Sequence, residues 1–234
     1  MRDGVTLRDS GSITVSQAGT VISALRVSGT ITVTASNVTI RDTLVQGGGN
    51  GYPIRVANGV RNVLIEYVEL DNLDSTGIGI FFNGGSGTVR NADIHSAEDG
   101  IRVQADDVVI ENSYIHDLQR YSGGHHDSIQ IREGNNVTIR GNSLLPYVAS
   151  TGDPMNAAIQ IGSLSGPPLQ NLSVENNFMN GGNYTINTGS AGDVASARYV
   201  NNVFGPNSRY GAHSTLRNSV WQNNTWYSSG ALIP

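Results

Sequence analysis

The chain has 234 residues, including 29 glycines but no cysteine, and carries a formal net charge of −5. Without cysteine there is no disulfide framework, thiolate nucleophile or Cys-ligated zinc. All 14 basic residues are arginine, so a lysine base or Schiff base is excluded. The arginines are scattered along an acidic chain, which argues against a nucleic-acid partner. No apolar run approaches the roughly 18 residues of a membrane span, so we expect no membrane insertion.

One short unit recurs along the chain. Its copies are NVTIRDTLV at 37–45, NVLIEYVEL at 62–70, GTVRNADI at 87–94, DVVIENSYI at 107–115, NVTIRGNSL at 136–144, NLSVENNFM at 171–179, ARYVNNVF at 197–204 and SVWQNNTW at 219–226. Their marker residues, 21 to 35 positions apart, are Ile40, Ile65, Val89, Ile110, Ile139, Val174, Tyr199 and Trp221. Units this short cannot bury their apolar faces alone, so the period predicts stacked coils.

A second series of segments lies between these copies. It comprises PIRV at 53–56, GIGI at 77–80, GIRV at 100–103, SIQI at 128–131, AIQI at 158–161 and TINT at 185–188. Most of these segments alternate in the period-two manner of a strand. Each repeat therefore contains at least two short strands separated by turns, and no helical stretch intervenes.

Stacking places the same residue type above itself on successive coils, about 4.8 Å apart. We expect one internal stack formed by Ile54, Ile78, Ile101, Ile129, Ile159 and Ile186. We also expect an asparagine ladder at one corner, formed by Asn142, Asn177, Asn202 and Asn224. Such a ladder satisfies side-chain and backbone polar groups between layers.

With these repeats, residues 12–228 resemble the right-handed parallel β-helix of the pectate-lyase-like superfamily, which includes polysaccharide lyases, polygalacturonases, mannuronan epimerases and phage tailspikes. The resemblance implies an all-β, single-domain solenoid of about eight coils over residues 1–234. Its handedness follows from the family and from the crossover rule. A β-sandwich is the competing fold, but it does not explain why repeated positions keep the same residue type.

The longest spacings between repeats indicate three loop insertions, near 117–126, 145–156 and 163–170. In solenoids, insertions usually gather on one face, which is often the binding face. The first insertion ends in His125-His126-Asp127, immediately before a predicted strand. This departure from the repeat makes it the preferred candidate for a functional site.

Asp99 and Asp127 occupy the same place in successive repeats, so stacking would bring them one coil apart. Two carboxylates this close disfavour simultaneous ionisation, so one could hold a proton or both could bind a cation. The first arrangement suits acid–base work on a glycosidic bond, and the second suits Ca²⁺. The alternative is that both are turn residues that accept hydrogen bonds from backbone amides.

His126 and Tyr121 lie in the same insertion and could share proton transfer at a sugar ring. We therefore assign Asp99, Asp127, His126 and Tyr121 to catalysis. A metal site formed by His116, His125 and Asp127 would match no known ligand spacing, so no metal ligands are assigned. The alternative is that the two histidines are the polar end of a loop.

A row of polar residues is expected on the outward face of the second strand series. Arg102, Gln130 and Gln160 fall on adjacent coils, and Arg132 extends the row. An arginine can pair with a uronate carboxylate through two hydrogen bonds. We therefore predict that these four residues, together with His125, bind substrate. The alternative is an ordinary solvated sheet face.

Two families of the superfamily offer partial motif matches. HDSIQI is similar to the Asp-Asp-x-Ile-x-Ile strand of polygalacturonases, with Asp127 at the second aspartate and His126 at the first, but their Gly-His-Gly and Arg-Ile-Lys motifs have no equivalent. The segment 121–127 resembles the Tyr…Asp-Pro-His motif of mannuronan C5-epimerases, with Tyr121 and His126 at matching spacing. Gly124 and His125 replace the aspartate and proline.

The sequence thus favours a protein that cleaves or modifies an extracellular acidic polysaccharide by lyase, hydrolase or epimerase chemistry. The alternative is a non-catalytic glycan-binding adhesin or a virion component such as a phage tail protein, and a plain structural solenoid is a third hypothesis. The chain shows no signal-peptide pattern. We therefore expect either secretion with the signal removed or a virion location. A monomer is expected in the first case and a homotrimer in the second.

Overall fold

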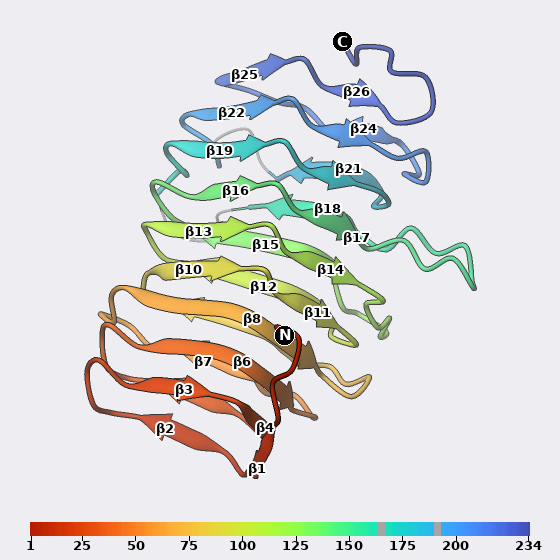
Figure 1. Cartoon of the computed structure of the whole chain (residues 1–234). Coiled ribbons are helices and arrows are strands. Elements are labelled where there is room, and N and C mark those ends of the chain that lie inside the picture. Colours follow the sequence, from red (N-terminus) through yellow and green to blue (C-terminus); the bar gives the residue numbers. More distant parts are fainter. Residues whose placement is uncertain (163–166, 190–192) are drawn as a thin grey trace.

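The computed structural model describes residues 1–162, 167–189 and 193–234, and within them the chain forms strands but no helix. In Figure 1 the strands are stacked in layers from the N-terminal coil, in red, to the C-terminal coil, in blue. Neighbouring layers pair in parallel, and the strands form a seventeen-stranded and a nine-stranded sheet. This is the parallel β-solenoid that the repeats predicted. The described residues contain no helix long and apolar enough to cross a lipid bilayer.

The nine-stranded sheet holds one column of strands. They are β2 (Ile13–Val15), β5 (Ile31–Val33), β7 (Ile54–Val56), β9 (Ile78–Asn83), β12 (Asp99–Gln104), β15 (Asp127–Glu133), β18 (Ala157–Ile161), β21 (Tyr184–Thr188) and β24 (Gly211–His213).

The seventeen-stranded sheet bends into two further columns. The first contains β3 (Val21–Ser23), β6 (Thr39–Gln46), β8 (Val63–Asp71), β10 (Gly87–Arg90), β13 (Val108–Glu111), β16 (Thr138–Arg140), β19 (Leu172–Glu175), β22 (Ala197–Val200) and β25 (Ser219–Gln222). The second contains β1 (Arg8–Ser10), β4 (Leu25–Ser28), β11 (Asp93–His95), β14 (Tyr114–His116), β17 (Ser143–Leu145), β20 (Phe178–Met179), β23 (Val203–Phe204) and β26 (Thr225–Trp226). Strands β6 and β8 run through the bend and belong to both columns.

The bends come from residues that tolerate a left-handed backbone. Asn112, Asn176 and Asn201 have φ values of 49°, 56° and 57°, and each turns the chain from the first column into the second. Asparagine adopts this conformation more readily than other residues that carry a Cβ. The frequent asparagine after each marker strand therefore encodes the corner, and the alternating apolar residues on either side point into one continuous core.

The predicted marker register is confirmed along its whole length. Each marker residue pairs with the next, in the order Ile40, Ile65, Val89, Ile110, Ile139, Val174, Tyr199 and Trp221. Equivalent positions therefore lie one coil apart throughout the molecule.

The internal isoleucine stack is also formed, with one correction. Ile80, not Ile78, stands between Ile54 and Ile101. The whole of β9 is shifted by two residues, which keeps the same side chains facing inward and aligns Phe82 with Val56 in the core. Phe82 is fully buried in this register, which removes a large apolar ring from water. The predicted register was based on Ile78 and took no account of Phe82. The remaining pairs, from Ile101 to Ile186, are as predicted.

The asparagine ladder is confirmed at the bend between the two columns of the seventeen-stranded sheet. The Asn177 Oδ1 atom accepts hydrogen bonds at 3.0 Å from both the backbone N–H and the Nδ2 of Asn142. Its own Nδ2 donates to the Ile139 carbonyl and to Asn202 Oδ1, both at 3.0 Å. Asn202 binds Asn224 in the same way. Every rung is buried, so the ladder satisfies polar groups that have no access to water.

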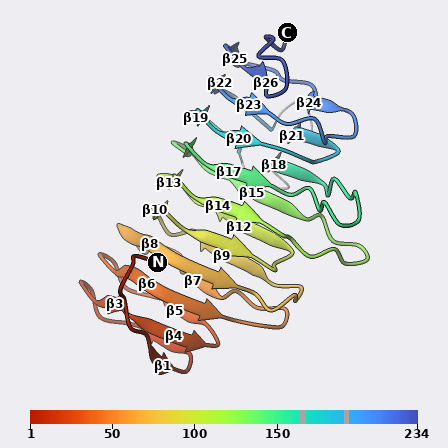
Figure 2. The same cartoon turned by 45° about the vertical axis from the view of Figure 1, so that its right-hand side comes forward.

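The predicted insertions lie at two different corners. The loop 117–126 joins β14 to β15 and the loop 146–156 joins β17 to β18, so both enter the same edge of the nine-stranded sheet. They project together at the right of Figure 2, and an Arg120–Asp153 ion pair connects them. The third insertion joins β18 to β19 at the opposite edge, and its residues 163–166 lie outside the described part of the chain. The expectation that insertions gather on one face thus holds for two of the three.

Candidate functional site

The predicted polar row lies on the outer face of the nine-stranded sheet. Strand pairing places Arg102 beside Gln130, and Gln130 beside Gln160. The row continues to Asn187. On its other side Phe81 pairs with Arg102, so an aromatic ring that the sequence analysis did not include borders the arginine.

Asp99 and Asp127 are stacked at the start of β12 and β15, as their sequence positions predicted. The Asp127 backbone N–H donates to Asp99 Oδ1 at 3.0 Å. Arg102 Nη2 donates to Asp99 Oδ2 at 2.8 Å. Both aspartates have an exposed fraction of 0%. Asp99 therefore uses one oxygen to hold the next coil and the other to orient the arginine of the polar row.

Asp127 lies in a different environment, although it is one coil away. Its Oδ1 accepts a hydrogen bond from Asn156 Nδ2 at 2.7 Å, and Gln130 Nε2 lies 3.4 Å from its Oδ2. Burial raises the pKa of Asp127 well above its usual range, and the nearby Asp99 raises it further. This direction agrees with the expectation that one carboxyl of the pair holds a proton.

His126 closes the loop beneath the surface. Its backbone is left-handed (φ 62°), and its Nε2 accepts a hydrogen bond from the Tyr121 backbone N–H at 2.7 Å. The proton of the neutral imidazole is therefore on Nδ1, which is buried without a partner. Burial, followed by the charge of Arg120, lowers the pKa of His126. The Tyr121 hydroxyl donates to the backbone carbonyl of Asp74.

The four residues assigned to catalysis thus lie together, but three of them are not at the surface. Asp99, His126 and Asp127 each have an exposed fraction of 0%. Their polar atoms contact neighbouring coils and loops, because the left-handed turn at His126 directs the imidazole under the loop. In the structure Asp99 contacts Asp127 and Arg102, and His126 contacts Tyr121, so these side chains connect neighbouring coils and loops.

Four of the five residues assigned to substrate binding line one small cavity. His125, Gln130, Arg132 and Gln160, together with Gly162, enclose a volume of about 60 Å³. His125 is exposed, unlike its neighbour His126. Within the described residues the Arg132 side chain forms no hydrogen bond or ion pair. Arg102, the fifth predicted binding residue, pairs with Asp99 instead.

Arg132 lies in an environment that disfavours its charge. Partial burial lowers the pKa of Arg132, and the neighbouring Arg102 lowers it further. The nearby Asp99 carboxylate raises the pKa of Arg132, but it is paired with Arg102. An anion bound at Arg132 would compensate its charge.

Sequence reasoning missed three contributors to the site. Asn156 comes from the loop 146–156 and holds Asp127, but no repeat position marks it. Glu98 is half-buried and accepts a backbone hydrogen bond from His125, and burial, followed by the charge of Asp99, raises the pKa of the Glu98 carboxyl. Its position beside Asp99 in the sequence was the available signal. Tyr52 packs its ring 4.8 Å from that of Phe81, next to the arginines.

The structure does not bring the considered metal ligands together. His116 lies on β14, where its ring nitrogens contact Asp93 and Asp117 at 2.8 and 2.7 Å. Within residues 1–162, 167–189 and 193–234, no group of three or more histidine, aspartate and glutamate side chains is arranged to hold a metal ion. The carboxylates of Asp99 and Asp127, considered for Ca²⁺, are engaged by the hydrogen bonds described above.

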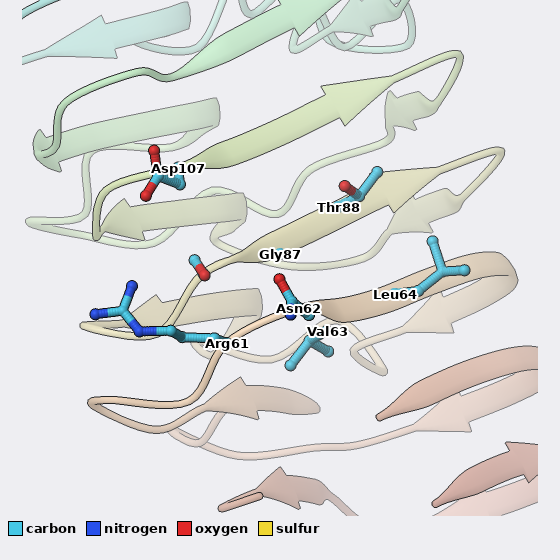
Figure 3. A pocket seen from close by; sticks show the side chains of 8 residues that line it. Arg61, Asn62, Val63, Leu64, Gly87, Thr88 and Asp107 are labelled. Atoms are coloured by element: carbon cyan, nitrogen blue, oxygen red, sulfur yellow. The ribbon is translucent and has the colours of Figure 1, made fainter. Parts of the chain in front are cut away.

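Another hollow, of about 490 Å³, lies at the corner that leads into the first column, where Arg61 and Asp107 border Gly87 (Figure 3). A second polar ladder joins Asn37 to Asn62 below it and Asp107 to Asn136 above it. The hollow lies where this ladder is interrupted. It therefore results from a gap in the scaffold and contains none of the predicted site residues.

Comparison with known families identifies the scaffold. A model described as a right-handed β-helix region matches residues 1–145 and 56–230. The chain belongs to the right-handed β-helix family. A comparison with curated protein sequences finds no match.

Two solved structures share the β-helix fold. The alginate lyase from Paenibacillus sp. str. FPU-7 is similar with a TM-score of 0.56 and 12% identity, over 93% of this chain and 95% of that one. Full-length tailspike protein 2 of Escherichia coli O157:H7 bacteriophage CAB120 is similar with a TM-score of 0.55 and 14% identity. The match covers 96% of this β-helix chain but spans only about a third (34%) of the tailspike. Likeness at such identity shows the fold alone.

Proposed function

We propose that this β-helix protein acts on an acidic polysaccharide, which it binds along the outer face of the nine-stranded sheet. The observation that carries the proposal is the unpaired Arg132 guanidinium, which shares a cavity with Gln130, Gln160 and His125. An arginine pairs with a carboxylate through two charge-assisted hydrogen bonds, while amides bind hydroxyl groups. The alginate lyase with the same fold supports a uronate-containing polymer as the substrate class.

The shape of the face suits an extended polymer. Arg102, Gln130 and Gln160 repeat along the stack, one strand apart, so each coil offers a polar side chain to a chain lying along the solenoid. Tyr52 and Phe81 add an aromatic border. The buried Asp99 and Asp127 fix Arg102, Gln130 and Asn156 in this arrangement.

The groups that remain accessible support cleavage by elimination. Neutralising a uronate carboxylate at Arg132 makes the proton at C5 of that sugar more acidic. The exposed His125 takes this proton, the C4–O bond breaks as the C4=C5 bond forms, and Glu98 protonates the departing oxygen. The raised pKa of Glu98 favours the protonated form that this role requires. His126 and Tyr121 hold the loop that carries His125.

A glycan-binding adhesin or virion component is the second candidate function. The observation that favours it is the complete burial of Asp99, His126 and Asp127, which leaves few accessible groups for acid–base chemistry. Both functions place the protein outside the cell or on a virion. A homotrimer in solution would support the virion assignment.

The binding surface is tested with Arg132→Met, which keeps an unbranched stem but removes the guanidinium and its charge. We expect the affinity for alginate or polygalacturonate to fall roughly tenfold or more, because a charge-assisted hydrogen bond contributes about 1.5–3 kcal/mol. Arg8→Met is the matched control, since Arg8 is an exposed arginine on the first coil. Equal affinities of the two variants for every uronate polymer tested would contradict the proposed surface.

Catalysis is tested separately from binding. Parent protein, His125→Ala and Glu98→Gln are incubated with each polymer, and unsaturated products and new reducing ends are measured. We expect both variants to lose product formation. Glu98→Gln should retain binding, whereas His125→Ala also removes one wall of the binding cavity and should weaken it. If the parent binds a uronate polymer through Arg132 but forms no product from it, the adhesin function is correct and the elimination chemistry is not.

A further inference from the structure

A second cleft lies between the two loops that flank the candidate site. It has a volume of about 550 Å³ and is lined by the loop 117–126 on one side, through Leu118 and Gln119, and by the loop 146–156 on the other, through Val148, Ser150 and Met155. This volume is typical of small-molecule sites. Both walls are insertions into the repeat, and Leu118 and Met155 also anchor them in the hydrophobic core of the solenoid.

The lining is apolar at its base and polar at its rim. Leu118 and Met155 are each 2% exposed, and Val148 is half-buried between them and the solvent. Ser150 presents its hydroxyl group on the exposed turn of the outer loop, while the Thr151 hydroxyl hydrogen-bonds within that turn. A sugar ring has the complementary pattern, since its C–H groups pack on apolar side chains and its hydroxyls bind polar ones.

The charges in the cleft compensate each other. Arg120 Nη2 donates to Asp153 Oδ1 at 2.9 Å, and its Nε also contacts the same carboxylate. The hydrogen bond from Arg120 lowers the pKa of Asp153, and the Met155 backbone N–H donates to the same group at 2.9 Å. The cleft therefore offers no unpaired charge to a ligand. This distinguishes it from the cavity at Arg132, whose guanidinium is unpaired.

The cleft and the candidate site have no lining residue in common, but the same two loops contribute to both. The loop 146–156 continues from Asp153 and Met155 to Asn156, which binds Asp127. The loop 117–126 continues from Arg120 to Tyr121 and His126, which are joined by a hydrogen bond. A ligand in the cleft therefore lies beside a polymer bound on the sheet.

We propose that this cleft is an accessory site for an uncharged sugar unit, carried as a branch or neighbouring residue of the acidic polymer. The proposal rests on the proposed function and extends it to the substrate class: an acidic backbone that bears neutral sugars. Arg132 recognises the charged part, and the cleft formed by Leu118, Val148, Ser150 and Met155 recognises the neutral part.

The test uses neutral monosaccharides alone, so it does not depend on the acidic polymer. Galactose, glucose, mannose, rhamnose, arabinose and N-acetylglucosamine are each titrated into the full chain, and binding is followed by saturation-transfer NMR. Ser150→Tyr fills the mouth of the cleft, and Ala149→Tyr adds the same bulk to the same exposed turn outside the lining. Thermal melting confirms that both variants are folded.

We expect at least one neutral sugar to bind, Ser150→Tyr to weaken it roughly tenfold or more, and Ala149→Tyr and Arg132→Met to leave it unchanged. The proposal is overturned if none of the sugars binds, if Ser150→Tyr has no effect, or if glucuronate and galacturonate compete at the same cleft. Failure of the proposed function would instead appear as uronate-polymer binding that is insensitive to Arg132→Met.

Discussion

The asparagine ladder and the site around Asp127 both bury polar side chains, but they satisfy them differently. In the ladder, Asn177 accepts two hydrogen bonds and donates two, and Asn142 and Asn202 donate in the same way. Around Asp127, four buried atoms of the described chain have no hydrogen-bond partner. They are Arg102 Nε, His126 Nδ1, Ser128 Oγ and Gln130 Oε1.

The difference separates scaffold from function. A buried polar atom without a partner costs about 1–3 kcal/mol. Other unpartnered atoms of the described chain, such as Arg41 Nε and Tyr199 Oη, lie elsewhere in the solenoid, but four fall within or beside β12 and β15. One of the four residues, Gln130, also lines the cavity at Arg132. The ladder therefore identifies the part of the molecule that builds the coils, and the unsatisfied cluster identifies the part that we expect to bind.

The largest effect on stability is expected in the ladder. Asn177→Ala removes four buried hydrogen bonds and should lower the free energy of unfolding by about 4 kcal/mol, at roughly 1 kcal/mol for each bond. Urea denaturation measures the change. Asn58→Ala is the control, because Asn58 is exposed, and we expect a change within about 0.5 kcal/mol. Similar losses in both variants would refute the importance of the ladder.

A smaller loss is expected at Asp99. Asp99→Asn leaves Arg102 without its carboxylate in a pair whose side chains are 17% and 0% exposed, which should cost about 3 kcal/mol. Glu111→Gln is the control, since the Arg140 partner of Glu111 is 57% exposed and the pair contributes about 0.5 kcal/mol. The two variants are compared by urea denaturation at neutral pH. A cost at Asp99 no larger than that at Glu111 would contradict its role as the positioning group.

Asp127 should respond in the opposite direction, although it is stacked directly on Asp99. Its pKa is raised in the folded state, so its contribution to stability is complete below the unfolded pKa, near 3.8, and is lost as pH rises through the folded value. Asp127→Asn removes this loss, because the amide that replaces the carboxyl does not ionise. We expect a gain of about 1 kcal/mol at pH 8 that disappears near pH 4.

This pH dependence is measured by urea denaturation of the parent and Asp127→Asn between pH 4 and pH 8. Asp127→Ala is the comparison, because it removes the charge but leaves Asn156 Nδ2 with Gln160 Oε1 as its remaining acceptor. An asparagine variant that is less stable than the parent at pH 8 would show that the carboxylate is ionised and stabilising there.

The repeat residues predicted the scaffold because the conformation of each short segment is set by its own residues, and the same residue types recur from coil to coil. The eight marker residues pair as expected, and the asparagine ladder forms where the sequence placed it. The error at Ile78 has the same origin: a segment with apolar residues at 78, 80 and 82 fits two registers, and only the packing of Phe82 against its neighbours chooses between them.

The site was predicted less completely, because it is formed by segments that do not repeat. The sequence identified His125, Gln130, Arg132 and Gln160, which share a cavity, but it could not show that His126 turns inward while His125 stays exposed. Glu98 and Asn156 were missed because their roles depend on how two loops fold over the sheet.

The sequence by itself determined the stacked coils, their register and the ladder, since apolar alternation and left-handed asparagines act within a few residues and recur along the chain. The tertiary structure decided which polar groups reach solvent. It pairs Arg102 with Asp99, leaves Arg132 unpaired, and closes a neutral cleft with Arg120 and Asp153. Burial and charge compensation depend on all the neighbours of a group in space, and a repeat pattern specifies only those in its own stack.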